Sequence, residues 1–192
     1  MSIARKAAKH GGMKLDRDRI VEKAFALLEA DGLDAFSVRR LASRLGVQPP
    51  ALYWHVPSKA ELVTLMARRL YAEAREVHEA LGDWRGWLLA FGHGLRGRLL
   101  AHRDGARLCA IAEPDRAATA ETRQALAAPL IERGLPENVA LSRLGSVIAL
   151  ALGWTIYEQN GGMHDYLEAL FDFDASFAAS LEAMIAGFAR EA

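Results

Sequence analysis

The residues best suited to chemistry lie between Ser37 and Lys59, in the run SVRRLASRLGVQPPALYWHVPSK. Basic, aromatic and amide side chains gather here, and such groups can contact the phosphates and base edges of nucleic acid. The run also holds an alanine, whose methyl group can touch the methyl group of a thymine. The candidate nucleic-acid contacts are Arg39, Arg40, Gln48, Pro49, Ala51, Tyr53, Trp54, His55 and Lys59.

A short helix is expected to carry the two arginines. Apolar residues recur between 38 and 45 at the spacing of one helix face, and both arginines lie away from that face. Ser37 is a good N-cap for this helix, and Gly46 can end it in the left-handed conformation. The pattern therefore predicts a short helix that ends in a tight turn.

A second short helix follows the turn and carries most of the other candidates. It opens at residues 48–50, where the first helical turn tolerates proline because its N–H groups have no partner within the helix. Leu52 and Val56 are four residues apart and would anchor the helix inward. A helix, a glycine turn and a second short helix form the helix-turn-helix layout, in which the second helix enters the major groove.

The segment LGVQPPALYWHVPSK resembles the signature of the tetracycline repressor (TetR) family of bacterial transcription regulators. The similarity runs from about Leu15 to Met66, and LYWHV is especially close to the tetracycline repressor itself. Weaker similarity follows at 102–108 (HRDGARL) and 171–188. The resemblance implies an N-terminal DNA-binding domain and a C-terminal domain that dimerises and binds an effector.

The resemblance also implies individual roles. Arg39 matches a position that reads a guanine, and a guanidinium is well shaped for that task. Tyr53, His55 and Lys59 match positions that hold the phosphate backbone. Pro49 stands where the tetracycline repressor has a glutamine that reads adenine, so the operator sequence does not carry over. Gln48 either substitutes for that glutamine or faces solvent, and Trp54 either packs the helix against its neighbours or touches DNA.

Charge is distributed unevenly along the 192 residues, although the net charge is zero. Residues 1–60 hold 11 Lys and Arg against 6 Asp and Glu, whereas residues 61–192 hold 13 against 18. A basic front end suits a local footprint on phosphate. Within it, residues 1–14 are basic and show no helical stripe, so we predict a mobile basic arm before the helix-turn-helix domain at 15–60.

The remaining pattern predicts an all-α fold. Helical stripes are expected over 16–30, 58–81, 84–101, 106–112, 119–133, 136–159 and 174–190, and no strand-like alternation appears. The architecture is thus an N-terminal three-helix helix-turn-helix domain joined by a long helix to a larger helical ligand-binding and dimerisation domain at 61–192.

Location and redox chemistry are also bounded by the sequence. A single cysteine allows no intrachain disulfide, and the first residues lack the apolar core of a secretory signal. The longest apolar run, 147–157, is shorter than the roughly 20 residues that span a bilayer. We therefore expect a cytoplasmic protein with no membrane partner.

Small residues recur every four positions on two of the expected helices. They are Gly145, Ala149 and Gly153 on 136–159, and Ala179, Ala183 and Gly187 on 174–190. Such stripes let helix backbones approach closely. The resemblance implies that these two helices pair with those of a second subunit in a four-helix bundle, giving a homodimer; tight packing within one chain is the alternative.

The resemblance implies an effector pocket lined by the helices at about 61–81, 84–101, 106–112 and 136–159. The candidate lining residues are Trp87, Phe91, Leu95, Leu108, Cys109, Trp154 and Tyr157, with His78 and Glu158 as polar anchors; each of them could instead be a core residue.

Tetracycline itself is not the expected effector. Cys109 stands where the tetracycline repressor offers a histidine to drug-bound magnesium, and Arg75, Phe91 and Leu95 occupy other drug-anchoring positions without matching them. A less polar, metal-free effector fits better, and no cofactor or metal site is expected because the histidines lack metal-ligand spacing.

The sequence thus predicts a ligand-responsive repressor that binds a palindromic operator as a homodimer. Two alternatives stay open: a constitutive DNA-binding protein without a small-molecule effector, and a small helical enzyme that uses Cys109 as a nucleophile. The enzyme is disfavoured, because nothing orients a partner for the thiol. The glycines at 92, 94 and 97 spell GxGxxG, but they fall inside a helical pattern rather than after a strand.

Overall fold

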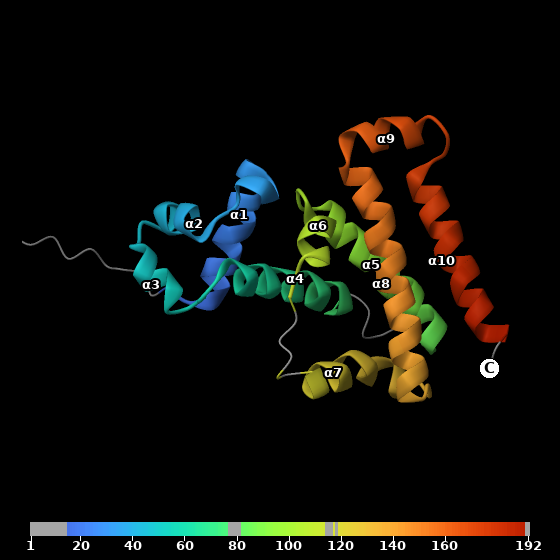
Figure 1. Ribbon diagram of the computed structural model, residues 1–192. Coiled ribbons are helices and arrows are strands. Elements are labelled where there is room, and N and C mark those ends of the chain that lie inside the picture. The colour runs from blue at the N-terminus through green and yellow to red at the C-terminus, as the bar shows by residue number, and fades with distance from the viewer. Residues whose placement is uncertain (1–14, 77–81, 114–116, 118, 191–192) are drawn as a thin grey trace, which may run out of the picture.

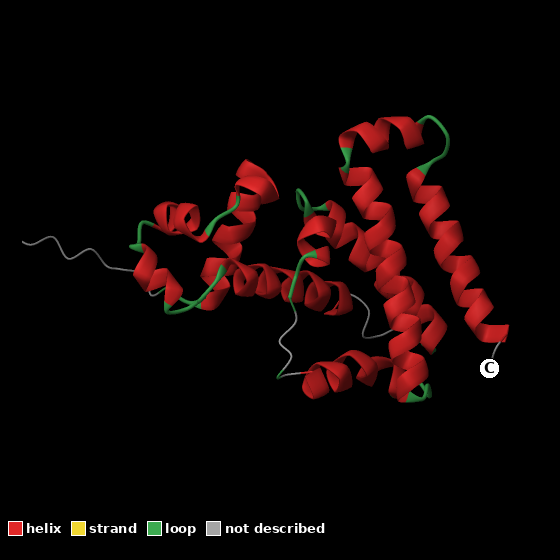
Figure 2. Cartoon of the chain, in the orientation of Figure 1, coloured by secondary structure: helices red, strands yellow, loops and turns green. Residues whose placement is uncertain are grey.

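The computed structural model describes residues 15–76, 82–113, 117 and 119–190. Within these residues the secondary structure is helical and contains no strand, which confirms the predicted all-α fold (Figure 2). The helices are α1 (Arg17–Ala35), α2 (Val38–Leu45), α3 (Pro49–Tyr53), α4 (Lys59–Glu76), α5 (Trp84–Leu100), α6 (Gly105–Ala110), α7 (Thr119–Ile131), α8 (Glu137–Gln159), α9 (Gly161–Glu168) and α10 (Phe173–Arg190).

Helices α1 to α3 form a small N-terminal unit at one end of the molecule, and α4 leads from it into the larger unit (Figure 1). The core of the small unit includes Ile20 of α1, Leu41 of α2 and Leu52 of α3, all fully buried. Leu62 of α4 is also fully buried, so this helix belongs to both units. A displacement of α4 would therefore carry the small unit with it.

Local signals in the helix-turn-helix segment act as the sequence predicts. The Ser37 hydroxyl accepts a hydrogen bond from the backbone N–H of Arg40 at 3.2 Å and so caps α2. Gly46 ends α2 with φ of 69°, a left-handed conformation that favours glycine. Pro49 and Pro50 fill the first turn of α3, where their missing N–H groups cost nothing.

The larger unit is built around α8. Helices α8 and α10 lie side by side, α9 bridges their ends, and α5 packs against both (Figure 1). Its core contains Phe91 and Leu95 of α5, Val147 of α8 and Phe177 of α10, each at most 1% exposed. These residues fix α5 against the α8–α10 pair.

Two helix boundaries differ from the predicted pattern. Gly32 does break α1, with φ of 74°, but the helix resumes and continues to Ala35. The short helix α9 was not predicted, because Gly161 and Gly162 suggested only the end of the preceding helix. Instead, the side chain of Asn160 accepts a hydrogen bond from the Met163 N–H and caps a new helix.

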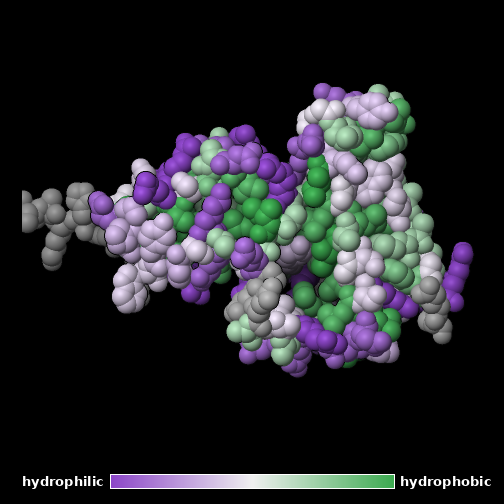
Figure 3. Space-filling model, viewed as in Figure 1, coloured by the Kyte–Doolittle hydropathy of each residue, from purple (hydrophilic) through white to green (hydrophobic). Residues whose placement is uncertain are grey.

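The surface of the larger unit is rich in apolar residues. Figure 3 shows hydrophobic residues over much of this unit and hydrophilic residues along the small unit. Among the described helices, only α8 is long and apolar enough to cross a membrane, a test that a core helix also passes, and 33% of its most apolar stretch is buried within the chain. Many apolar residues of α8 are therefore only partly covered by the described chain.

Candidate nucleic-acid interface and ligand cavity

Helix α3 presents its predicted contact residues to solvent. Leu52 and Val56 are fully buried, which confirms that they anchor the segment. Tyr53 and Trp54, between them, are 45% and 90% exposed. This answers the open question about Trp54, because a side chain so exposed packs against no neighbouring helix. Gln48 and Ala51 are exposed as well, whereas Pro49 and His55 are half-buried.

The two arginines of α2 differ in their surroundings. Arg40 forms an ion pair with Asp31 of α1 at 3.1 Å, and the same carboxylate meets Arg44 at 3.4 Å. Arg39 is exposed, and within the described residues no carboxylate lies within ion-pair distance of its guanidinium. Arg39 is thus the arginine that is free to meet a partner, whereas Arg40 is partly engaged in holding α2 to α1.

Lys59 lies at the first residue of α4, where it also contacts α1. Its Nζ atom donates a hydrogen bond to the carbonyl of Leu33 at 3.5 Å and lies 5.8 Å from the centre of the Phe36 ring. The ammonium group remains exposed. Lys59 therefore steadies the junction between α1 and α4 and still has donors for a phosphate.

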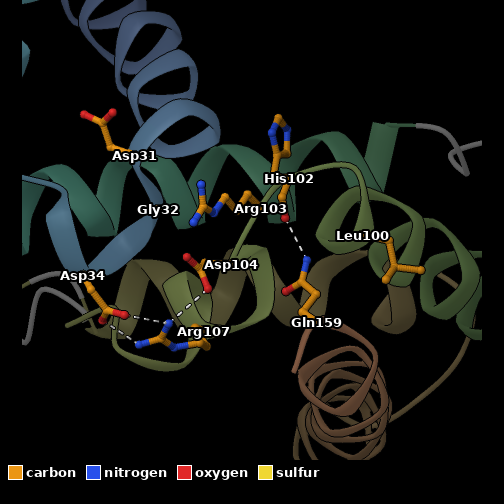
Figure 4. A pocket seen from close by; sticks show the side chains of 9 residues that line it. All are labelled: Asp31, Gly32, Asp34, Leu100, His102, Arg103, Asp104, Arg107 and Gln159. Atoms are coloured by element: carbon orange, nitrogen blue, oxygen red, sulfur yellow. Dashed lines mark hydrogen bonds and ion pairs between the residues drawn. The ribbon is translucent and has the colours of Figure 1, made fainter. Parts of the chain in front are cut away.

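A polar cleft of about 440 Å³ separates the small unit from the turn between α5 and α6 (Figure 4). Across it, the backbone N–H of Leu33 donates to the Asp104 carboxylate at 2.8 Å. Arg107 bridges Asp104 at 3.0 Å and Asp34 of α1 at 2.8 Å. These bonds join the end of α1 directly to the start of α6.

A second set of contacts crosses the same junction. The Glu29 carboxylate of α1 accepts a hydrogen bond from the backbone N–H of Arg103 and meets the His102 ring at 3.0 Å. That ring also packs on Phe25, with 4.4 Å between ring centres. The α5–α6 turn is therefore held against α1 by polar and aromatic contacts.

Gln159, the last residue of α8, links this turn to the large unit. Its amide donates to the carbonyl of His102 (Figure 4). It also donates to the carbonyl of Leu99 and accepts from the backbone N–H of Ala106 at 3.1 Å. All of its side-chain polar atoms are thus used in fixing the end of α5 and the start of α6. Helices α8, α6 and α1 are consequently connected through one turn.

A separate cavity of about 450 Å³ lies between α4, α6, α7 and α8, and we call it the α4–α7 cavity. Its lining combines apolar side chains with polar ones, most of which come from α4. The lining residues are Thr64, Ala67, Arg68, Tyr71, Ala72, Arg75, Cys109, Ala112, Thr122, Ala125, Leu126 and Ile148. This volume lies within the range of pockets that hold small molecules.

Thr64 and Cys109 connect the cavity walls. The Thr64 hydroxyl of α4 donates to the carbonyl of Glu113, beyond the end of α6, at 2.7 Å. Burial raises the pKa of the Cys109 thiol to about 12, although a hydrogen bond with Tyr71 lowers it. Cys109 is therefore a neutral thiol at physiological pH. The Thr64 hydrogen bond holds α4 to the segment that follows α6.

The predicted effector residues do not form one site. Of the predicted residues that the structure describes, only Cys109 lines the α4–α7 cavity. Trp154 and Tyr157 line a different apolar cavity of about 440 Å³ between α8 and α9. Trp87 lines a third hollow between α5 and α7, and His78 lies outside the described residues. The remaining apolar candidates, Phe91, Leu95 and Leu108, are core residues.

Glu158, predicted as a polar anchor, has a structural partner instead. Its carboxylate accepts two hydrogen bonds from Arg96 of α5, at 2.9 and 2.7 Å, and its side chain is only 9% exposed. Asp174 of α10 meets the same guanidinium at 2.6 Å. Burial alone would lower the pKa of Arg96, but hydrogen bonds with these two carboxylates raise it. Sequence could not reveal this pair, because 62 residues separate its members.

Sequence analysis put Arg75 at a drug-anchoring position through the resemblance, but it named none of Arg68, Tyr71 and Arg75 as an effector contact, although these residues form the polar wall of the α4–α7 cavity. Arg68, Tyr71 and Arg75 lie three and four residues apart, which is the spacing of one helix face. That spacing was a usable signal, but the apolar stripe of the same helix dominates its pattern.

Two protein-family models match the chain. The model for bacterial regulatory proteins of the tetR family matches residues 20–66, and the model for the tetracyclin repressor-like C-terminal domain matches residues 78–169. A curated relative, the class A tetracycline repressor protein from transposon 1721 of Escherichia coli, is 37% identical over 150 residues, covering 77% of this chain and 69% of the relative.

Solved structures share the fold over most of its length. TetR from Acinetobacter baumannii AYE is 32% identical and has a TM-score of 0.74, with 92% of this chain and 98% of that chain covered. TetR of class A, in complex with 5a,6-anhydrotetracycline and magnesium, is 32% identical with a TM-score of 0.72, covering 92% and 99%. The similarity thus spans both the small unit and the larger one.

Proposed function

Because the chain belongs to the tetR family of bacterial regulatory proteins, which are DNA-binding transcriptional regulators, we infer that it represses transcription by binding a palindromic operator as a homodimer until a small-molecule effector releases it. The observation that carries the proposal is the outward face of α3, where Tyr53 and Trp54 are exposed while Leu52 is buried. A regulator that binds an operator would act in the cytoplasm, and we propose that location for this protein.

Docking through α3 assigns a different task to each group of residues. Arg39 reads a base edge by a bidentate contact, and Ala51 meets a thymine methyl group. Tyr53, His55 and Lys59 hold phosphates and fix the register of the helix on the duplex. This surface is flanked by Arg40, Gln48 and Trp54. Pro49 makes no hydrogen bond to a base, because its side chain has neither donor nor acceptor.

The homodimer is proposed to form through α8 and α10. Gly145 and Ala149 of α8 are exposed in this chain, as are Ala179, Ala183 and Gly187 of α10. A Cβ atom added at Gly145, Gly153 or Gly187 would meet no atom within 4 Å. The small-residue stripes are therefore not consumed by packing within the chain, which favours their use against a second subunit.

Effector binding is proposed to act through α4. The α4–α7 cavity has one wall on α4, and α4 shares its core with α1 to α3. A ligand that prefers a state with more widely spaced α3 helices would lower operator affinity, because the two helices must match a groove repeat of about 34–36 Å. The contacts of α1 with the α5–α6 turn offer a second route from the cavity walls to the small unit.

The alternatives find less support. A constitutive DNA-binding protein needs no cavity, yet about 450 Å³ lies open between α4 and α7. An enzyme based on Cys109 needs a thiolate, whereas burial raises the pKa of this thiol to about 12. The effector is proposed to differ from a tetracycline–magnesium complex, because Cys109 replaces the magnesium-facing histidine and Arg75, Phe91 and Leu95 replace other drug anchors.

Selection of duplexes from a random-sequence pool tests the proposal. The full chain should enrich an inverted repeat whose half-sites are one helical turn apart, with two chains per duplex in sedimentation. Enrichment should be lost when Tyr53 and Trp54 are both replaced by alanine, and kept in Arg98→Ala, a control on α5. Failure to enrich any repeat, or one chain per duplex, would overturn it.

A further inference from the structure

One face of α4 brings two guanidinium groups to a cavity whose other walls are mainly apolar. Arg68 and Arg75 both line the α4–α7 cavity, with Tyr71 between them. Opposite them lie apolar side chains from three other segments, including Ala112, Leu126 and Ile148. The cavity therefore combines a large apolar surface with positive charge on a single wall.

Neither arginine is neutralised by the described part of the chain. No carboxylate there lies within ion-pair distance of Arg68 or Arg75, although the neighbouring Arg69 is paired with Glu73 at 3.0 Å. Within the described residues, the Arg75 side chain donates a single hydrogen bond, from Nη2 to the carbonyl of Ala125 at 2.9 Å. A guanidinium has five N–H donors, so most of those on Arg75 are left for a ligand.

The two positions differ in depth. Arg75 is half-buried against α7, whereas Arg68 is exposed at the cavity mouth. Seven residues separate them, so their Cα atoms lie about 10 Å apart along the helix axis. Arg75 would hold one acidic group of a ligand. Arg68 would attract the anion from solvent, and because Arg68 is exposed, salt screens this attraction.

We propose that the α4–α7 cavity binds an apolar organic anion, with its acidic group on Arg75 and its rings or chains against Ala112, Leu126 and Ile148. This inference rests on the proposed function in one respect, which is that the bound anion acts as the effector. Hydrogen bonds to charged partners are the strong ones, and a guanidinium can hold a carboxylate or sulfonate through two parallel bonds. The apolar remainder of the cavity supplies affinity without selecting for charge.

Two fluorescent probes separate charge from apolar contact. 8-Anilinonaphthalene-1-sulfonate carries a sulfonate, and N-phenyl-1-naphthylamine has the same rings without it. The wild-type protein should bind the anionic probe more tightly at low salt, and added salt should weaken only that probe. Equal affinities at low salt would overturn the proposal without recourse to any variant.

Variants then assign the preference to Arg75. Arg75→Gln should weaken binding of the anionic probe about tenfold or more and leave the neutral probe unchanged, and Arg75→Lys should restore part of the loss. Arg68→Gln should lose less, and Arg69→Gln, on the same helix but outside the cavity, should bind both probes as wild type does. A tenfold loss corresponds to about 1.4 kcal/mol. An unaltered anion preference in Arg75→Gln would refute the assignment.

A blocking variant locates the probes. Ala125 is exposed at the cavity edge, so Ala125→Trp should exclude both probes without disturbing the core. Retention of both probes would show that they bind elsewhere and would overturn the site.

The anion site and the regulatory role can fail independently. If Arg75→Gln loses the anion preference but no duplex is ever enriched, the anion site stands and the regulatory role fails. If a duplex is enriched and the preference persists, only the anion site fails.

Discussion

Glu158→Gln tests whether the buried ion pair between α5 and α8 is structural. Arg96 and Glu158 have side chains that are 11% and 9% exposed, and they form two hydrogen bonds of 2.9 and 2.7 Å. Removing one partner of a buried pair costs about 3–5 kcal/mol, because the other charge stays buried without compensation. Asp174 still meets Arg96 at 2.6 Å, so we expect a loss near the lower end of that range.

Urea unfolding followed by circular dichroism measures this loss, at a fixed chain concentration because a dimer's stability depends on it. Asp174→Asn is the matched control: its carboxylate is 86% exposed, so it should cost at most about 1 kcal/mol. Replacing Arg96 and Glu158 together by methionine should recover most of the loss, because no unpaired charge remains. A Glu158→Gln midpoint equal to that of wild type would refute the reasoning and reinstate Glu158 as a candidate ligand anchor.

Three further perturbations test other contacts. Asp104→Ala removes the acceptor of the Leu33 N–H and should lower the free energy of unfolding, measured by calorimetry, by about 1.5–3 kcal/mol. Asp104→Asn should lose less, because asparagine keeps an acceptor and tolerates the φ of 57° at this position. Equal losses in the two variants would contradict this role of Asp104. Burial raises the pKa of Cys109 to about 12, so little of the reactive thiolate is present at pH 8. Its reaction with a disulfide reagent at that pH should be at least about a hundredfold slower than that of free cysteine. A rate like that of free cysteine would contradict the burial of Cys109. Gly92→Ala places a Cβ 2.7 Å from the side chain of Leu181, which is fully buried. Overpacking should cost about 1–3 kcal/mol and outweigh the helix-propensity gain of about 1 kcal/mol, so the urea midpoint should fall. A raised midpoint would show that the Leu181 side chain moves aside.

The helix-turn-helix unit could be predicted because its signals are local. Ser37 caps the helix that begins at the next residue, and Gly46 ends it in a conformation that few other residues adopt. Leu52 and Val56 lie four residues apart, which orients the short helix before any tertiary contact is known. Each signal acts within a few residues, so the chain alone reveals it.

The α4–α7 cavity could not be predicted in the same way, because its walls meet only in three dimensions. The sequence shows Glu158 as an acid near aromatic residues, but the partner that commits it to the core, Arg96, lies on another helix. Conversely, the resemblance put Arg75 at a drug-anchoring position, but its hydrogen bond to the carbonyl of Ala125 on α7, at the wall of the cavity, appears only in the fold. The small helix α9 was missed because its N-cap, Asn160, precedes two glycines that are typical of a helix end.

The most direct measurement of the central claim is the affinity of Arg39→Ala for the selected operator and for a scrambled duplex of equal length. Because a bidentate contact to a guanine contributes about 1–3 kcal/mol of discrimination, we expect operator binding, followed by fluorescence anisotropy at fixed salt, to weaken about 5- to 150-fold. Binding to the scrambled duplex should change little by comparison, and Arg98→Ala should match wild type on both. Unchanged operator affinity in Arg39→Ala, or equal losses on the two duplexes, would contradict the proposed docking of α2 and α3 in the major groove.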